Sequence, residues 1–178
     1  MFLRKPLDRN VLRPYLYDVC TVLFSINESE RYPFALVANR DEFLARPAQA
    51  MHWWEQGVLA GKDLEAGGMW LGLKRTGEFS VVTNVRDLKA NKEGALSRGE
   101  LVLKTLDSPS EASAFLSVKG DQYNPYNLLY GNFKTLNFQS NYNARSHSVT
   151  GGAHGLSNAD FNTPWPKVSQ GKRDLQSV

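Results

Sequence analysis

The stretch CTVLFSINESERYPFALVANRDEF, residues 20–43, decides the fold of this chain. Its two apolar runs, residues 21–24 and 34–38, are rich in strand-forming side chains and have the length of buried strands. The polar segment 27–31 between them is typical of a turn. The stretch therefore predicts an antiparallel β-hairpin.

This hairpin also predicts the place of the only cysteine in the chain. With the turn centred between Ser29 and Glu30, Cys20 falls opposite Asn39, to within a residue or two. The thiol is therefore expected beside the densest polar cluster of the sequence, residues 39–42 (NRDE).

The composition indicates one globular domain, and 178 residues are enough for a sizeable core. Basic and acidic side chains nearly balance, 21 against 18, which argues against a nucleic-acid partner. No apolar run approaches the length of a membrane span. A single cysteine excludes an internal disulfide framework and favours a reducing compartment, so we expect a cytoplasmic protein.

Residues 1–19 are interpreted as an N-terminal extension and residues 20–178 as the domain. The extension has basic side chains but no apolar core of signal-peptide length and no small-residue cleavage site. It is either a disordered arm or the result of a start site assigned too early. Synthesis from the codon of Val19, followed by removal of the initiator residue, would make Cys20 the first residue.

A second hairpin is expected from residues 67–73 and 79–85, joined by a turn at 74–77. In this pairing Asn84 lies opposite Gly68. A side-chain amide at a strand end then faces a residue without a side chain, which leaves room for a ligand.

Two capping-box patterns predict helices. Residues 97–100 (SRGE) precede an apolar run, and residues 108–111 (SPSE) combine an N-cap serine with proline and glutamate at the first and third helical positions. The second helix should end near Val118, before Gly120.

The last third of the sequence predicts a hairpin of residues 126–133 and 136–140 and a helix entered through residues 163–167. From Gly171 to the C-terminus we recognise no closing element.

Cys20 is the candidate nucleophile, and a thiol needs a base or a positive neighbour to react as thiolate. His52, His147 and His154 are candidate bases through tertiary folding, but none has a recognisable partner pattern. The alternative base is the α-amino group of Cys20 itself, whose ordinary pKa is near neutrality. That alternative requires Cys20 to be residue one.

An acyl-transfer site also needs hydrogen-bond donors for the oxyanion. Asn84 and Asn158 each end a predicted strand or turn and are candidates for this role. Arg40 or Asp41 would hold the substrate or orient the α-amino group.

A purely structural interpretation stays open beside this one. A lone cysteine in an apolar strand usually fills the core. An Arg-Asp pair after a strand usually forms an ion pair or a turn cap. No metal-ligand spacing appears, so we assign no metal.

Several motifs follow one another in an order that resembles one family. They are Cys20-Thr21, Ala38-Asn39-Arg40-Asp41-Glu42-Phe43 with Arg46-Pro47, Gly67-Gly68-Met69-Trp70-Leu71-Gly72, Thr83-Asn84, Arg98-Gly99-Glu100, Tyr126-Asn127-Leu128, and Gly155-Leu156-Ser157-Asn158-Ala159 with Thr163-Pro164-Trp165. On this ordered set the chain resembles the NRDE family, also called the transport and Golgi organisation protein 2 family, over residues 20–172.

The resemblance implies an α+β fold, an αββα sandwich of antiparallel sheets of the N-terminal-nucleophile (Ntn) hydrolase type. Through likeness to the cysteine amidases that cleave bile salts and penicillin V, it implies Cys20 as nucleophile with its freed amine as base. It also implies Asn84 as an oxyanion donor and Asn158 as a second amide. Arg40 and Asp41 match loosely, because those amidases place arginine and aspartate in a different local order.

Members of the family continue with another helix and closing strands, so the domain is expected to be truncated at its C-terminus. Two functions of different class stay open. One is a cysteine Ntn amidohydrolase of linear amides or similar acyl compounds, which requires no cofactor. The other is a non-catalytic carrier or trafficking protein for haem or for a lipid such as acyl-CoA. Both imply a small-molecule ligand, and neither fixes the oligomeric state.

Overall fold

The computed structural model describes residues 20–177, which form two antiparallel β-sheets and three α-helices. The smaller sheet has the order β10–β1–β2, formed by Gly152–Leu156, Thr21–Ile26 and Phe34–Asn39. The larger sheet keeps chain order from β3 to β9, with strands Ala48–Trp53, Val58–Asp63, Leu71–Lys74, Phe79–Asn84, Tyr126–Asn132, Thr135–Ser140 and Arg145–Val149. The helices are α1 (Gly99–Asp107), α2 (Ala112–Lys119) and α3 (Pro166–Leu175), with short 3₁₀ turns η1 (Leu88–Ala90) and η2 (Gly120–Gln122).

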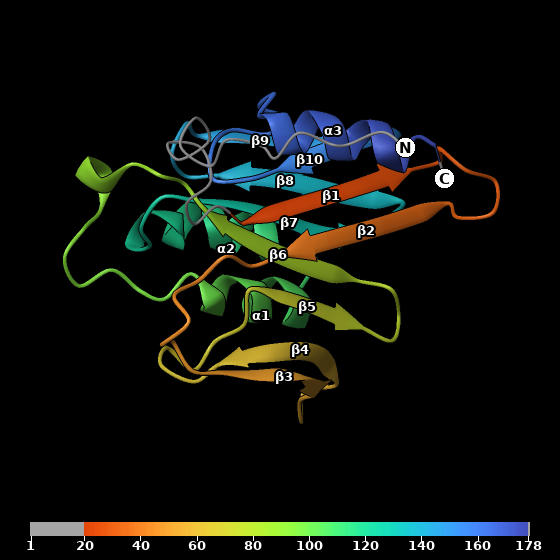
Figure 1. Cartoon of the computed structure of the whole chain (residues 1–178). Helices are drawn as coiled ribbons and strands as arrows, with labels where there is room; N and C mark the ends of the chain where they lie inside the picture. The colour runs from red at the N-terminus through yellow and green to blue at the C-terminus, as the bar shows by residue number, and fades with distance from the viewer. Residues whose placement is uncertain (1–19, 178) are drawn as a thin grey trace.

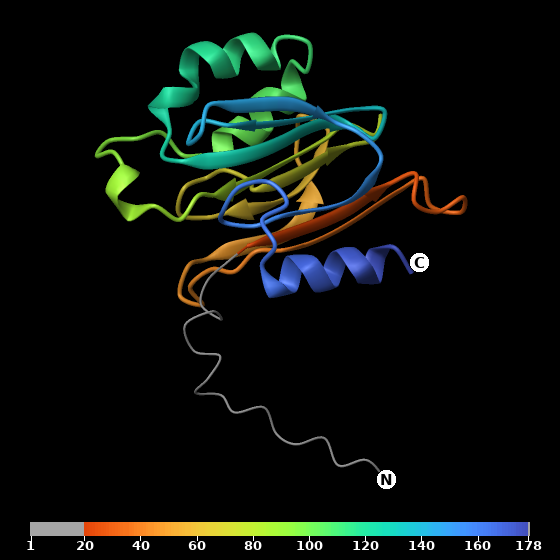
Figure 2. The same ribbon diagram turned by 90° about the horizontal axis from the view of Figure 1, so that it is seen from above.

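The elements are stacked in four layers. Helices α1 and α2 lie on the outer side of the larger sheet, and α3 lies on the outer side of the smaller sheet (Figure 1). The view from above shows the order helix, sheet, sheet, helix (Figure 2). This arrangement confirms the predicted α+β fold and its αββα layering. No helix in residues 20–177 is long and apolar enough to cross a membrane.

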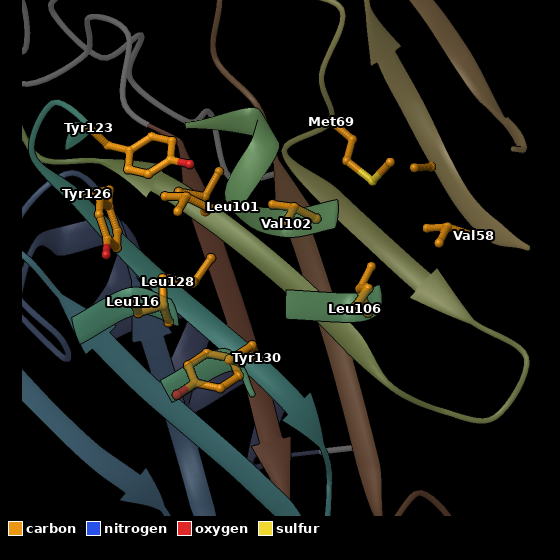
Figure 3. Packing of buried hydrophobic residues seen from close by; sticks show 13 residues of the cluster. Val58, Met69, Leu101, Val102, Leu106, Leu116, Tyr123, Tyr126, Leu128 and Tyr130 are labelled. Atoms are coloured by element: carbon orange, nitrogen blue, oxygen red, sulfur yellow. The ribbon is translucent and has the colours of Figure 1, made fainter. Parts of the chain in front are cut away.

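Two apolar clusters hold these layers together. Between the sheets, Val22 and Phe24 of β1 pack with Leu129 and Phe138 of the larger sheet, and all four are fully buried. The second cluster lies between the larger sheet and its helices, where side chains of α1 and α2 meet those of β4, β7 and the segment before β5 (Figure 3). Burial of one such side chain stabilises the fold by about 1.5–3 kcal/mol, so these clusters dominate the stability.

The first hairpin is confirmed, with a register that differs by one residue from the prediction. The structure pairs Asn39 with Thr21 rather than with Cys20. The reason is the loop 27–33, which has an odd number of residues, begins with Asn27 at φ 56° and is closed by the Asn27 N–H donating to the Pro33 carbonyl. Continuing the observed register sets Cys20 beside Arg40.

The second hairpin has the predicted register. Leu71 pairs with Val81 and Leu73 with Phe79, the pairing that places Asn84 opposite Gly68. The strand β5 itself begins only at Leu71, so residue 68 lies beyond the ladder.

Both predicted helices exist, but neither capping box forms. Helix α1 begins at Gly99 and α2 at Ala112, three residues after the predicted proline start, and neither has a side-chain cap. Instead, the main-chain carbonyls of Ser97 and Ser108 accept the N–H groups of Glu100 and Glu111 in ordinary turns. Carbonyl acceptors thus replace the serine hydroxyls that the pattern predicts.

The helix expected to be entered through residues 163–167 is confirmed as α3, and it continues through Gly171 to Leu175, where we recognised no element from the sequence. A Cβ atom at position 171 would lie 2.2 Å from Leu23 of β1, so the glycine allows α3 to lie directly on the sheet. Gly155 of β10 makes a similar close contact with Val168 of α3.

Candidate functional site

A cavity of about 420 Å³ opens at the edge where β1 begins and where β2 and β6 end. Strand β4, the turn before β5 and the start of α1 complete its walls. Of the five predicted site residues, four line this cavity: Cys20, Arg40, Asp41 and Asn84. The structure therefore brings together side chains that are up to 64 positions apart in the sequence.

Cys20 is held in place through its main chain. Its carbonyl oxygen accepts a hydrogen bond of 2.6 Å from the hydroxyl of Ser157. The carbonyl of Ser157 in turn accepts from the hydroxyl of Thr83 on β6, at 2.7 Å. This chain of bonds links the start of β1 to both sheets, so the position of the thiol is fixed by elements distant in sequence.

The surroundings of Cys20 do not activate its thiol. Burial raises the pKa of the Cys20 thiol, and the charges of Asp41 and Glu42 add to this effect. The main-chain contact with Asp41 and the charge of Arg40 act in the opposite direction and are outweighed. The side chain is therefore a neutral thiol at pH 7, and a nucleophilic role needs a separate base.

The signature arginine, Arg40, is an ion-pair partner in this structure. Its Nη2 atom lies 3.0 Å from a carboxylate oxygen of Glu42 and 2.9 Å from one of Asp63. Arg46 shares the same Asp63 oxygen, with Nε at 2.8 Å. Two guanidinium groups are thus neutralised by two carboxylates on one wall of the cavity.

Asp63 is the centre of this ion-pair cluster. Its other oxygen accepts hydrogen bonds from the N–H groups of Glu65 and Ala66 and so caps the turn after β4. Burial opposes ionisation of Asp63, but the Ala66 N–H, the Arg46 guanidinium and the Glu65 N–H together keep its pKa below the usual value. No sequence pattern identified Asp63, because its partners Arg46 and Arg40 lie 17 and 23 residues away.

Asp41 is held by its own neighbours. The side-chain amide of Asn39 donates to Asp41, and Nζ of Lys167 on α3 lies 3.9 Å from its carboxylate. The carbonyl of Asp41 lies 3.9 Å from the Cys20 sulfur. The signature residues thus form a locally bonded turn whose backbone contacts the thiol.

The two predicted amides differ in their surroundings. The side chain of Asn84 is exposed to the cavity and makes no hydrogen bond with another residue of the described range 20–177. Asn158 is buried and does not line the cavity; its neighbour Ser157 makes the contact with Cys20. The Oδ1 atom of Asn158 has no hydrogen-bond partner among the described residues.

None of the three histidines lines the cavity. His52 stacks on Trp54, whereas His147 and His154 pack around Phe161. An imidazole base beside Cys20 is therefore not provided by residues 20–177. Within the same range, no group of three histidine, cysteine or acidic side chains is arranged to hold a metal ion.

Arg98 is a cavity residue that the sequence analysis did not assign to the site. Its segment was interpreted as a helix cap, although it also belongs to the motifs of the resemblance. One Nη atom of Arg98 donates to the Pro125 carbonyl at 3.0 Å. The close backbone contact of Gly99 with Gly68, where an added Cβ would lie 3.1 Å from the other chain segment, brings the start of α1 against the cavity.

The two stacked antiparallel sheets with helices on both outer sides define a protein of the α+β class, with a cysteine at the start of the first strand facing a cavity. The family model described as "Transport and Golgi organisation 2" matches residues 19–178, and the chain belongs to this family. The predicted family is thereby confirmed.

Curated relatives agree with this assignment. The chain is 34% identical to "Transport and Golgi organization protein 2 homolog" of Bos taurus over 173 residues, and 32% identical to the protein of the same name from Homo sapiens. These alignments cover 87% of this chain and 62% of each relative. The chain thus spans about three-fifths of the length of the relatives it matches.

Proposed function

We propose that this protein is a cysteine hydrolase of the Ntn type, acting on a linear amide or a related acyl compound. The observation that carries the proposal is the position of Cys20 on the wall of a cavity of about 420 Å³, together with the unbonded amide of Asn84. A nucleophile and a free hydrogen-bond donor facing one ligand-sized space are the minimum that acyl transfer requires.

The raised pKa of the Cys20 thiol makes the source of the base the central question. In the proposed mechanism Cys20 is the first residue, and its α-amine accepts the thiol proton. The sulfur attacks the carbonyl carbon of the substrate, and the leaving amine departs with a proton, which leaves an acyl thioester on Cys20. Water then cleaves the thioester and restores the thiol.

The remaining residues have supporting roles in this proposal. Asn84 donates a hydrogen bond to the oxyanion that forms on the substrate. The free Oδ1 of Asn158 is an acceptor suited to an α-ammonium group, because buried oxygens normally find a donor. Arg40 and Asp41 shape the wall around the thiol. The prediction that Cys20 becomes the first residue concerns residues 1–19, which lie outside the described range.

The decisive experiment is intact mass with N-terminal sequencing of the protein from its native host, followed by screening of amide libraries. A chain that begins at Cys20 and whose turnover disappears in Cys20→Ala supports the proposal. A chain that keeps residues 1–19 and shows no turnover contradicts it. Because a reducing compartment keeps a single thiol free, a cytoplasmic location is part of the proposal.

The second candidate is a carrier of haem or of an acyl lipid on the same fold. It is favoured by the same raised pKa, since a neutral half-buried thiol is a poor nucleophile but does not hinder binding. Titration with haem and with acyl-CoA distinguishes the two candidates. Binding that is equal in the parent and in Cys20→Ala, without product formation, favours the carrier.

A further inference from the structure

The part of the cavity wall at the start of α1 carries a guanidinium group without a carboxylate partner in contact. Among residues 20–177, Arg40 and Arg46 pair with Glu42 and Asp63, but Arg98 forms no ion pair. Its only hydrogen bond there goes to a main-chain carbonyl, that of Pro125. A guanidinium group carries five N–H donors, so most of those of Arg98 remain available.

The surroundings of Arg98 do not compensate its charge. Burial lowers the pKa of Arg98, and the charges of Cys20 and Glu42 oppose this effect without reversing it. Arg98 is therefore a half-buried cation on the wall of the cavity that Cys20 also lines. Such a group gains from a bound anion, because an uncompensated charge away from water is costly.

The charges around the whole cavity also favour an anion. Four cationic side chains and three carboxylates line it, and one of these carboxylates, Asp41, lies 3.9 Å from Lys167, which is not part of the lining. The fourth cation, Lys62, has its ammonium group over the ring of Trp54 at 5.4 Å and keeps no ion pair within residues 20–177. Arg98 and Lys62 are therefore the two lining cations that form no ion pair within residues 20–177, which favours an anionic ligand.

We propose that the cavity binds small acyl or amide compounds that carry a carboxylate, and that the guanidinium group of Arg98 holds this carboxylate beside Cys20. A planar guanidinium fork matches a carboxylate in a bidentate manner. The proposal deepens the proposed function by naming the charge of its ligand. Binding of the carboxylate beside Cys20 does not itself depend on turnover.

The experiment uses two alkylating agents that differ in charge, iodoacetate and iodoacetamide. In both reactions the Cys20 sulfur forms a bond to carbon, iodide leaves with the electron pair, and the thiol proton passes to solvent. Because Cys20 is the only cysteine, intact mass reports the alkylation of this residue alone. Both agents react with the same thiolate, so the ratio of their rate constants is independent of the thiol pKa.

In the purified full chain we expect this ratio, iodoacetate over iodoacetamide, to exceed the ratio for free cysteine about tenfold, the size of one charge-assisted hydrogen bond. Arg98→Gln should bring it back to the value for free cysteine, and Arg98→Lys should keep part of the preference. The matched control is Arg75→Gln, which removes the same charge from an exposed site outside the cavity. This control should keep the ratio of the parent.

A ratio that Arg98→Gln leaves unchanged, or that Arg75→Gln lowers equally, overturns the proposal. It is also overturned if Lys62→Gln abolishes the preference while Arg98→Gln does not. Competition on the unmodified chain covers the case in which Arg98→Gln fails to fold. In this competition experiment, propionate should protect Cys20 from iodoacetamide, whereas propionamide and inorganic phosphate should not. Protection by phosphate alone, or equal protection by propionamide, contradicts the carboxylate assignment.

These outcomes are separable from those of the proposed function. If the preference for iodoacetate depends on Arg98 but the chain hydrolyses no amide, the hydrolase proposal is rejected and the carboxylate-site proposal is retained. If the chain hydrolyses neutral amides and Arg98→Gln does not change the rate, the carboxylate-site proposal is rejected and the hydrolase proposal is retained.

Discussion

Two walls of the same cavity carry arginines in opposite electrostatic situations. The paired wall consists of Arg40, Glu42, Arg46 and Asp63, where each guanidinium group has at least one carboxylate partner within 3.0 Å. The open wall is the start of α1, where Arg98 has only a carbonyl partner. The difference teaches that an arginine beside a reactive group is not thereby a ligand-binding residue. What decides is whether the protein already neutralises its charge.

The largest effect is expected from breaking the paired wall at Asp63. Asp63→Asn removes the shared carboxylate and leaves two partly buried guanidinium groups with fewer partners. We expect the free energy of unfolding to fall by about 2–3 kcal/mol, less than for a fully buried pair because the groups are partly exposed. Urea denaturation measures this loss.

The matched control for Asp63 is Glu65→Gln. Glu65 pairs with Arg46 at 3.5 Å, but its side chain is 62% exposed, so the expected change is below about 0.5 kcal/mol. Equal losses in the two variants would mean that burial does not set the strength of this wall.

The next substitution tests the close backbone packing that positions the open wall at the start of α1. Gly99→Ala puts a Cβ atom 3.0 Å from the Met69 carbonyl oxygen, which cannot move without shifting the backbone. We expect a loss of about 1–2 kcal/mol, because overpacking outweighs the better helix propensity of alanine. Thermal or urea denaturation gives the value.

Ser97→Ala is the control at the same helix start. Since its side chain makes no capping bond, the change should stay below about 0.5 kcal/mol. A loss near 1 kcal/mol would instead show that the serine caps α1 in solution, as the sequence pattern predicted.

The next comparison is between the paired arginine Arg40 and the unpaired arginine Arg98. Arg40→Met leaves Asp63 and Glu42 with fewer partners and should destabilise the protein by about 1–2 kcal/mol. Arg98→Met removes a desolvated charge without stranding a carboxylate and should stay within about 1 kcal/mol of the parent. The comparison in urea fails if Arg98→Met is the more destabilised variant.

The smallest expected effect is a change in the pH dependence of the free energy of unfolding. The pKa of Asp63 is lower in the folded state than its unfolded value of about 3.9, so the unfolded chain binds the proton more readily. The stability that Asp63 contributes is fully present well above that value and is lost as the pH falls through the lowered folded pKa. Asp63→Asn should therefore show a shallower acid-side decline, measured by denaturant midpoints between about pH 5 and pH 2.

How much of the fold the sequence predicted depends on how local each signal is. The β5–β6 pairing was predicted to the residue, because a short turn fixes the register of a hairpin. The β1–β2 pairing was predicted to within one residue, because a longer loop containing Asn27 in a left-handed conformation changes the count. The helix entered through residues 163–167 was predicted, but its continuation through Gly171 was not, because this glycine is explained by Leu23, 148 positions away.

The residues of the candidate site also differ in how local their sequence signals are. Residues close in sequence or near predicted strand ends were found, namely Cys20, Arg40, Asp41 and Asn84. Asp63, Ser157 and Arg98 were not, since the partners that give them a role lie on other elements. For Arg98 the local pattern was also misleading, because a capping box and a cavity wall use the same residues.

By itself the sequence determined the family, through an ordered set of motifs, and the resemblance to that family implied the αββα layering; short-range periodicity placed the single thiol at the start of the first strand. Only the tertiary structure decided which charges are neutralised. Electrostatic pairing acts over a few ångströms in space whatever the separation along the chain, so Asp63 neutralises Arg40 and Arg46 while Arg98 keeps an uncompensated charge facing the cavity.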